Sequence, residues 1–244
     1  DAPKADFTGM VNRSRGVADG MSKGVTFLMK KNNIDVIMGE GKLMPGKKLE
    51  VKAADGKTST LEAQHIIVAT GARSRHLPSL PQDGKKIIGY REAMTLKTQP
   101  KKMVVVGSGA IGVEFAYFYN AIGTEVTVVE YVDRIVPVED KEVSKQLERT
   151  FKKAGINIMT SSEVTGVDTS GKNCKVTVKT KKGEETLECD VVLSAAGVVS
   201  NIENIGLEEC GIVHDRGKIV VDDFYATNIP GYYAIGDCVP GPSL

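Results

Sequence analysis

One stretch of the sequence restricts the possible fold more than any other. In residues 103–130 an apolar run meets a glycine cluster, a mostly apolar helical segment follows, and a second apolar run ends on a carboxylate. Gly107, Gly109 and Gly112 give the pattern G-x-G-x-x-G between the first run and the helical segment. This order predicts a strand, a tight turn, a helix and a second parallel strand, which is the βαβ unit of dinucleotide-binding proteins.

Each glycine of this loop has its own expected role. Gly107 permits the turn out of the strand, Gly109 lets a pyrophosphate approach the backbone, and Gly112 lets the helix pack close to the sheet. The amides at the predicted helix N-terminus offer unpaired N–H donors and a partial positive charge to phosphates. These amides belong to Ser108, Gly109, Ala110 and Ile111.

Glu130 ends the second apolar run and selects between nucleotides. A carboxylate at this place accepts hydrogen bonds from the adenosine ribose hydroxyls and repels a 2′-phosphate, so the sequence predicts NAD rather than NADP. Arg134 follows four residues later and is expected to be a surface residue. Glu114 lies two residues after Gly112. From the residues alone, it is equally a carboxylate favoured by the helix N-terminus and a carboxylate directed at a redox centre.

The segments before the glycine loop predict a helix and a small β-region. Apolar residues at helical spacing between positions 17 and 28 predict a helix. This helix is expected to end at Asn32 or Asn33. Residues 34–38, IDVIM, are expected to form a short buried strand. Alternating segments over 39–70 predict a small antiparallel sheet that closes on a buried strand, and 71–100 is expected to be a linker region.

The segments after the loop complete an α/β pattern. An amphipathic helix is expected within 137–155, a buried strand at 156–160, and a three-stranded antiparallel meander over 163–190. Buried strands then end at Gly197 and just before Asp237. This order predicts an open parallel sheet with helices on its faces, and ligands bind at the carboxyl edge of such a sheet.

Composition argues against several other classes of protein. The formal net charge is +1, from 32 basic and 31 acidic residues, so neither nucleic acid nor a membrane surface is an expected partner. No apolar run approaches the length of a membrane span. The three histidines are scattered and no metal-ligand spacing occurs, so no metal is expected.

The four cysteines form no C-x-x-C and no close pair in the sequence: Cys174, Cys189, Cys210 and Cys238. Free thiols in a reducing compartment are therefore expected. Cys238, next to Asp237, is expected to be a packed thiol rather than a redox group.

Several motifs together resemble the flavin-dependent pyridine nucleotide–disulfide oxidoreductases, and within them the dihydrolipoamide dehydrogenase branch. The matching pieces span nearly the whole chain: GVTFLMKKNNIDVIMGEGKL, IIVATGARSRHLP, VVVGSGAIGVEFA, VTVVE, GLEECGI and TNIPGYYAIGDCVPGP. The resemblance implies a Rossmann-like NAD-binding domain, a parallel sheet plus the antiparallel meander, inserted in a partial FAD-binding domain. The implied limits are 1–99 for FAD, 100–220 for NAD, and a return to the FAD domain over 221–244.

The resemblance also implies roles for individual residues. The residues implied to contact FAD are Gly41, Thr70, Gly71, Ala72 and Asp237, with Ser243 and Leu244 near the isoalloxazine. The residues implied to line the NAD site are Gly107, Ser108, Gly109, Ala110, Ile111, Gly112, Glu114, Glu130, Val164 and Gly197. In this family Glu114 would pair with a lysine near the flavin, which favours its functional role.

The sequence departs from the family pattern in three ways. The first FAD-binding loop with its redox-active C-x-x-x-x-C is absent, and so is the C-terminal dimerisation domain with its catalytic His–Glu pair. GVVSN at 197–201 replaces the more usual Gly-Arg-x-Pro-Asn. We therefore expect an internal fragment of a longer enzyme, without catalytic residues of its own, inactive as given and weak in FAD binding.

The implied function of the longer enzyme is oxidation of dihydrolipoamide with NAD+ through FAD and a redox disulfide. The implied partners are lipoyl-domain or small-molecule substrates, a 2-oxo-acid dehydrogenase complex and a second copy in a homodimer, in the cytoplasm or, in a eukaryote, the mitochondrial matrix. Two alternatives stay open: another family member, such as an NADH oxidase, a CoA-disulfide reductase or mercuric reductase, and an NAD-binding module without activity.

Overall fold

A computed structural model describes residues 5–241, and these pack into two compact units. Among these residues, the glycine-loop unit comprises residues 5–22 and Ser74–Gly197, and the second unit comprises Lys23–Arg73 and residues 198–241. The chain therefore changes unit earlier, on each passage, than the expected domain limits at 99 and 220. Those limits concern which cofactor each stretch serves, and they stay a prediction.

The glycine-loop unit is built on a five-stranded parallel sheet in the order β6-β13-β7-β8-β9. The strands are β6 (Ile87–Ile88), β13 (Val191–Ser194), β7 (Lys102–Val106), β8 (Glu125–Val129) and β9 (Asn157–Met159). Successive residues of a strand face opposite sides of the sheet. The valines of β7 and β8 therefore supply two separate cores, one on each face of the sheet. The parallel sheet expected from the sequence is present.

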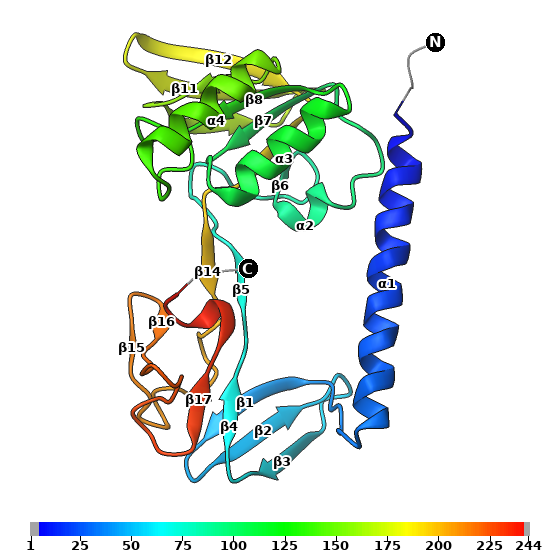
Figure 1. Cartoon of the computed structure of the whole chain (residues 1–244), viewed down its shortest axis with the longest axis vertical. Helices are drawn as coiled ribbons and strands as arrows, with labels where there is room; N and C mark the ends of the chain where they lie inside the picture. The colour runs from blue at the N-terminus through cyan, green and yellow to red at the C-terminus, as the bar shows by residue number, and fades with distance from the viewer. Residues whose placement is uncertain (1–4, 242–244) are drawn as a thin grey trace. The chain divides into compact units, whose positions relative to one another are not determined.

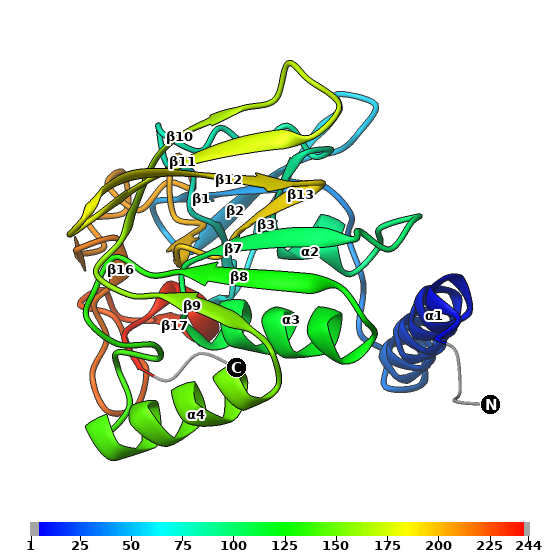
Figure 2. The same ribbon diagram turned by 90° about the horizontal axis from the view of Figure 1, so that it is seen from above.

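Two helices cover one face of this sheet (Figure 2). They are α3 (Ala110–Ala121) and α4 (Lys141–Lys153), which pack with Phe7 at the start of α1 (Phe7–Lys31). Asp140 caps α4 by accepting from the Glu142 amide at 2.8 Å. The core on this face contains Met103, Val105, Ala116, Tyr119, Val126, Val128, Phe151 and Leu193.

The other face is covered by the antiparallel meander, so the helices that the sequence predicted on the faces of the sheet lie on one face alone (Figure 2). The meander runs through β10 (Glu163–Asp168), β11 (Cys174–Thr180) and β12 (Gly183–Cys189). Cys174, Val176 and Val178 alternate toward the sheet and are fully buried. Their period of two gives the meander one apolar face, which packs on that side of the sheet in place of a helix.

The expected linker over 71–100 contains regular structure. It includes β5 (Ala72–Ser74), the buried edge strand β6 and a short helix α2 (Tyr90–Ala93). Asp83 fixes the turn before β6 because its carboxylate accepts from three backbone amides, and these bonds hold the pKa of Asp83 below its usual value against the opposing effect of burial. A two-residue strand between turn residues is too short to show a period, which is why the sequence did not reveal it.

The second unit contains several small sheets around its own core (Figure 1). One is the predicted antiparallel sheet, ordered β1-β2-β3. The strands of this unit are β1 (Glu40–Met44), β2 (Lys48–Lys52), β3 (Thr58–Glu62), β4 (Ile66–Val68), β14 (Val198–Ser200), β15 (His214–Asp215), β16 (Lys218–Ile219) and β17 (Tyr232–Ala234). β4 pairs in parallel with β17, and β14 pairs with β5. A short 3-10 turn, Gly236–Cys238, follows β17.

Residues 34–38 do not form the expected strand. The predicted helix end is present, because α1 ends at Lys31 and Asn33 adopts a left-handed φ of 53°. Beyond it, Val36 is 61% exposed and Met38 is 80% exposed, and no strand of residues 5–241 pairs with this segment. An apolar run forms a buried strand only where a neighbour covers it, and the pattern alone does not report that neighbour.

No helix within residues 5–241 has the length and apolar character needed to cross a membrane.

Tyr119 provides a test of the core beneath α3. Its ring is fully buried, burial raises the pKa of its hydroxyl to about 12, and that hydroxyl donates to the Ala93 carbonyl at 2.5 Å. Tyr119→Phe leaves a buried carbonyl without its partner, and we expect a loss of about 1–3 kcal/mol in the free energy of unfolding. Urea unfolding followed by circular dichroism measures this loss. Tyr131→Phe is the matched control, since Tyr131 is 72% exposed, and equal stabilities of the two variants would contradict the prediction.

Candidate dinucleotide-binding site

The glycine loop follows β7 and turns directly into α3. Gly107 has a φ of 99°, and a Cβ atom there would lie 2.5 Å from the Ala195 carbonyl oxygen. A Cβ on Gly112 would collide with the Gly107 carbonyl oxygen. Both positions therefore require glycine for the turn and for close packing of α3 on the sheet.

Gly109 differs from the other two glycines of the loop, Gly107 and Gly112. Its φ is −66°, which any residue adopts, and a Cβ there would meet no protein atom within 4 Å. Nothing in the fold of this unit therefore requires glycine at this position. The missing side chain leaves the backbone open to a bound group, which fits a pyrophosphate.

The N-terminus of α3 has donors without an internal partner. Gly109 is the N-cap and has no side chain to cap the helix, and the Val113 amide is the first to bond back, to Gly109. The amides of Ala110, Ile111 and Gly112 precede that first bond and have no intrahelical acceptor. Such a helix start fits a phosphate-bearing ligand.

The Ser108 amide is not one of these free donors, which corrects the expectation from the sequence. It donates to Glu130 Oε2 at 2.8 Å, and the Ser108 hydroxyl donates to the same oxygen at 2.6 Å. Ser108 is fully buried. This residue therefore contacts β8 and not the open side of the loop.

Glu130 directly follows β8, which ends at Val129, and is 8% exposed. Besides the two bonds from Ser108, its Oε1 accepts from the Val132 amide at 3.0 Å. A buried carboxylate is stable only when it is hydrogen-bonded, and here three donors satisfy it. A carboxylate has about four acceptor positions, so one position on Oε1 is not used by these donors.

The segment after Glu130 closes against the glycine loop. The Val136 amide donates to the Ser108 carbonyl at 3.0 Å, and Ser144 on α4 donates its hydroxyl to the Val136 carbonyl at 3.2 Å. Arg134 is bound within its own loop, to Asp133 at 3.2 Å and to the Pro137 carbonyl at 2.9 Å. Its side chain is one-third exposed, and these bonds hold it within its own loop.

The remaining residues of the implied NAD site lie in the same unit but differ in their exposure. Glu114 is exposed and lies just past the first turn of α3. Gly197 follows β13, beside β7, and is exposed with a φ of 95°. Val164 is buried in the core between the meander and the sheet, so its side chain packs there.

In the second unit, the ends of β4 and β17 bring two predicted motifs together. These neighbouring parallel strands lead into Thr70–Ala72 and into Asp237. The Asp237 carbonyl accepts from Ser200 Oγ at 2.8 Å and from Lys218 Nζ at 2.6 Å. Gly41 lies apart from them in sequence, exposed on β1 opposite Val51. Ser243 and Leu244 lie outside the described residues.

Two residues at the Thr70–Ala72 segment, Arg73 and Asn201, were not among the site residues predicted from the sequence. Asn201 donates its amide to the Gly71 carbonyl at 2.9 Å and its side chain to the Thr70 carbonyl at 3.0 Å. Arg73 binds both carboxylate oxygens of Glu203, at 2.7 and 3.0 Å. The only signal in the sequence was the unusual GVVSN segment, in which Ser200 and Asn201 stand.

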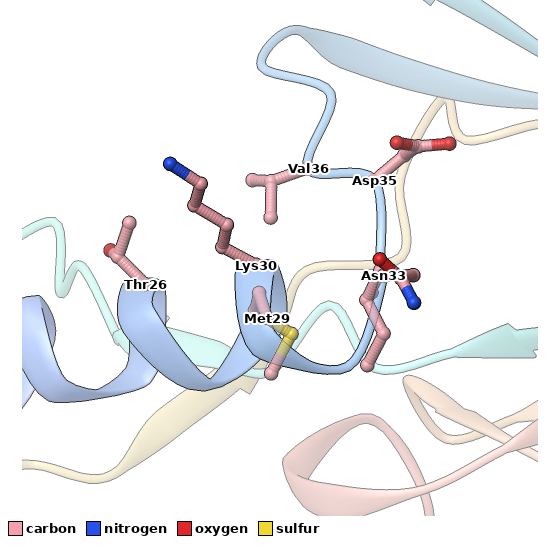
Figure 3. A pocket seen from close by; sticks show the side chains of 7 residues that line it. Thr26, Met29, Lys30, Asn33, Asp35 and Val36 are labelled. Carbon is pink, nitrogen blue, oxygen red and sulfur yellow. The ribbon is translucent and has the colours of Figure 1, made fainter.

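An open hollow occurs in the second unit at the end of α1 (Figure 3). Its lining residues are Thr26, Met29, Lys30, Asn33, Ile34, Asp35 and Val36. None of the predicted site residues belongs to it.

The four cysteines are free thiols, as predicted, and Cys174, Cys189 and Cys238 are buried. Cys174 and Cys189 are nonetheless direct partners across β11 and β12, a proximity that the sequence spacing did not reveal. Burial raises the pKa of Cys189 to about 12, so its reactive thiolate is scarce at neutral pH. Among the described residues there is no group of three or more side chains suited to a metal.

Comparison with known proteins identifies the group to which these features belong. The sequence pattern of the pyridine nucleotide-disulphide oxidoreductases matches residues 2–244. The chain belongs to this family. Family members use FAD and NAD(P), in agreement with the glycine loop and strand-end motifs.

Curated relatives include dihydrolipoyl dehydrogenases from Zymomonas mobilis, 42% identical over 99% of this chain and 52% of the relative, and from Rhizobium etli, 43% identical over 99% and 53%. A leghemoglobin reductase from Vigna unguiculata is 38% identical over 99% of this chain and 47% of its own length. The solved structure of LpdA from Mycobacterium tuberculosis has a TM-score of 0.91 at 34% identity, over 99% of this chain and 54% of that one. The chain spans about half the length of the relatives it matches.

The Arg73–Glu203 pair gives a prediction for pH dependence. Hydrogen bonds from Arg73 lower the pKa of Glu203 from 4.5 to about 2. A pKa that is lower in the folded state stabilises the fold above the unfolded value, and this contribution is lost as the pH falls from about 4.5 toward 2. We expect Glu203→Gln to be less stable than the unmodified chain at pH 6 and equal to it near pH 2, by chemical denaturation. Half of each side chain is exposed, so the difference is small.

The control places Glu203→Gln in an Arg73→Gln background. Without the guanidinium most of the pH-dependent difference disappears, and backbone hydrogen bonds at Ile202 and Glu203 account for a smaller remainder. A difference of unchanged size there would contradict the role of Arg73.

Proposed function

We propose that this chain binds NAD(H) at the carboxyl edge of its parallel sheet and serves a flavoprotein that oxidises dihydrolipoamide with NAD+. The observation that carries the nucleotide part is Glu130, whose fixed carboxylate keeps an acceptor position beside an uncapped helix start. The 42–44% identity to dihydrolipoyl dehydrogenases from several bacteria supports the substrate part.

Most of the predicted NAD-site residues in the glycine-loop unit have a proposed task. Amides of Ala110, Ile111 and Gly112 bind the pyrophosphate beside the open Gly109, and Glu130 accepts from the adenosine ribose. Val164 and Gly197 border the nucleotide through their backbone. For the exposed Glu114 we propose a pairing with a lysine near the flavin, as the family resemblance implies.

In the second unit, Thr70, Gly71, Ala72 and Asp237 are the proposed FAD contacts, together with Gly41, Ser243 and Leu244. The backbone of Thr70, Gly71 and Asp237 is fixed by Asn201, Ser200 and Lys218, which leaves the Asp237 carboxylate for a ribityl hydroxyl. Bound FAD supplies hydride exchange with the nicotinamide and electron exchange with a cysteine pair. The chain itself binds, orients and supplies charge. For a longer protein of the size of the relatives, we propose a homodimer with a 2-oxo-acid dehydrogenase complex as its partner. We propose a cytoplasmic or mitochondrial location for it.

Two other functions are rivals. The identity to leghemoglobin reductase is close to that of the plant dihydrolipoyl dehydrogenases, so similarity alone does not decide the final substrate. An NAD-binding module without activity is favoured by a different observation: all the proposed NAD contacts lie in one unit with its own cores. Assay of NAD+-dependent dihydrolipoamide oxidation, with added FAD, separates these functions.

Nucleotide preference tests the proposal directly. We expect NADH to bind more tightly than NADPH, and we expect Glu130→Gln to narrow that preference at least about tenfold, because repulsion of the 2′-phosphate is lost. Fluorescence titration with each nucleotide gives both Kd values. Glu125→Gln is the matched control, since Glu125 is an exposed carboxylate at the opposite end of the same strand. An unchanged preference in Glu130→Gln contradicts the proposal.

Flavin content is a separate test. No α-helix begins in residues 23–73 or 198–241, so the described part of the second unit lacks a helix N-terminus to hold the FAD pyrophosphate. We therefore expect the 244-residue chain to bind FAD weakly. Absorption of the purified chain, with and without added FAD, measures this binding, and a stoichiometric flavin band in the sample without added FAD contradicts the prediction.

A further inference from the structure

Ser108 is the residue of the glycine loop whose side chain has no assigned task. All three of its polar groups are bound within the protein: the amide and the hydroxyl to Glu130 Oε2, and the carbonyl to the Val136 amide. The side chain is fully buried and directed to β8, whereas the open position of the loop is its neighbour Gly109. A serine here therefore acts on Glu130 and leaves the ligand side of the loop clear.

The two bonds from Ser108 divide the Glu130 carboxylate into two different oxygens. Oε2 receives two donors, which fill its lone-pair positions, while Oε1 receives only the Val132 amide. The terminal torsion of a glutamate is broad, so an unrestrained carboxylate rotates easily. The short hydroxyl bond at 2.6 Å opposes that rotation and keeps one acceptor position on Oε1.

We propose that Ser108 is a positioning residue that sets nucleotide selection, by fixing Glu130 so that Oε1 accepts a single ribose hydroxyl. The inference rests on the proposed NAD site. A ribose with a free 2′-hydroxyl donates to the remaining position of Oε1. A 2′-phosphate has no such donor and brings negative charge to a carboxylate that is held in place and does not turn away.

Removal of the hydroxyl then affects the two nucleotides differently. Ser108→Ala keeps the backbone amide bonds from residue 108 to Oε2 and from Val132 to Oε1 but removes the short hydroxyl bond, so the carboxylate is held less firmly and the ribose meets a less ordered acceptor. Hydrogen bonds to charged groups are strong enough for us to expect about a tenfold rise in the Kd for NADH. The Kd for NADPH stays the same or falls, since NADPH does not use this bond and a less firmly held carboxylate repels its 2′-phosphate less, and the preference for NADH falls accordingly.

The experiment measures the Kd of NADH and NADPH for the unmodified chain, Ser108→Ala, Glu130→Gln and the double variant. If Ser108 acts through the Glu130 carboxylate, Ser108→Ala in the Glu130→Gln background changes the Kd for NADH by less than about twofold. Ser108→Gly removes the same hydroxyl with less bulk and repeats the measurement if the alanine variant folds poorly. Thr124→Val is the control, because Thr124 is a buried hydroxyl that donates to the Pro100 carbonyl at 2.8 Å, at the other edge of the sheet.

The outcomes are distinct. Equal weakening of both nucleotides by Ser108→Ala overturns the inference, since that result describes a loop that has merely lost order, and so does an unchanged preference. A full additive effect in the double variant overturns it as well. If the unmodified chain binds no NADH, the proposed function fails and this inference falls with it, whereas binding with an unaltered Ser108→Ala preference overturns the inference alone.

Discussion

The hydrogen bonds between Ser108 and Glu130 join the glycine loop to the end of the neighbouring strand β8. Glu130 is almost completely buried, and a carboxylate in that environment requires donors. The loop supplies two of them and the following turn supplies the third, at Val132. The shape of the loop, the start of α3 and the course of residues 131–136 are therefore all tied to one charged group.

This arrangement connects local sequence to the site. Gly107 and Gly112 allow α3 to approach the sheet, and Gly109 keeps the approach to the helix start open. The meander covers the face of the sheet opposite α3 and α4, so both faces are occupied by packed apolar side chains. The carboxyl edge of the sheet is then the natural place for a ligand, as in other open α/β sheets.

Much of this could be predicted because the informative signals are local. The strand, glycine loop, helix and second strand over 102–130 follow from apolar period and glycine spacing, and the three meander strands follow from alternation and turn residues. Residues 34–38 show the limit, since an apolar run does not reveal whether a neighbour covers it. The face covered by the meander was likewise invisible, because a period of two marks an apolar face and not its partner. In the site, the role of a carboxylate at Glu130 was predictable from its place after the second strand. Its bonds to Ser108 were not predictable, because they depend on the loop geometry.

The Arg75 amide donates to the Gly197 carbonyl at 3.0 Å, so the continuous stretch from Ser74 to Gly197 starts and finishes at nearly the same point. A segment with adjacent ends can be carried by a host polypeptide as a cassette, in the manner of a domain inserted into a surface loop. Its removal or exchange would require the host to rejoin only a short gap, between Arg73 and Val198. Because Phe7 of α1 also packs in the core of this unit, a transferred module would carry the start of α1 together with residues 74–197.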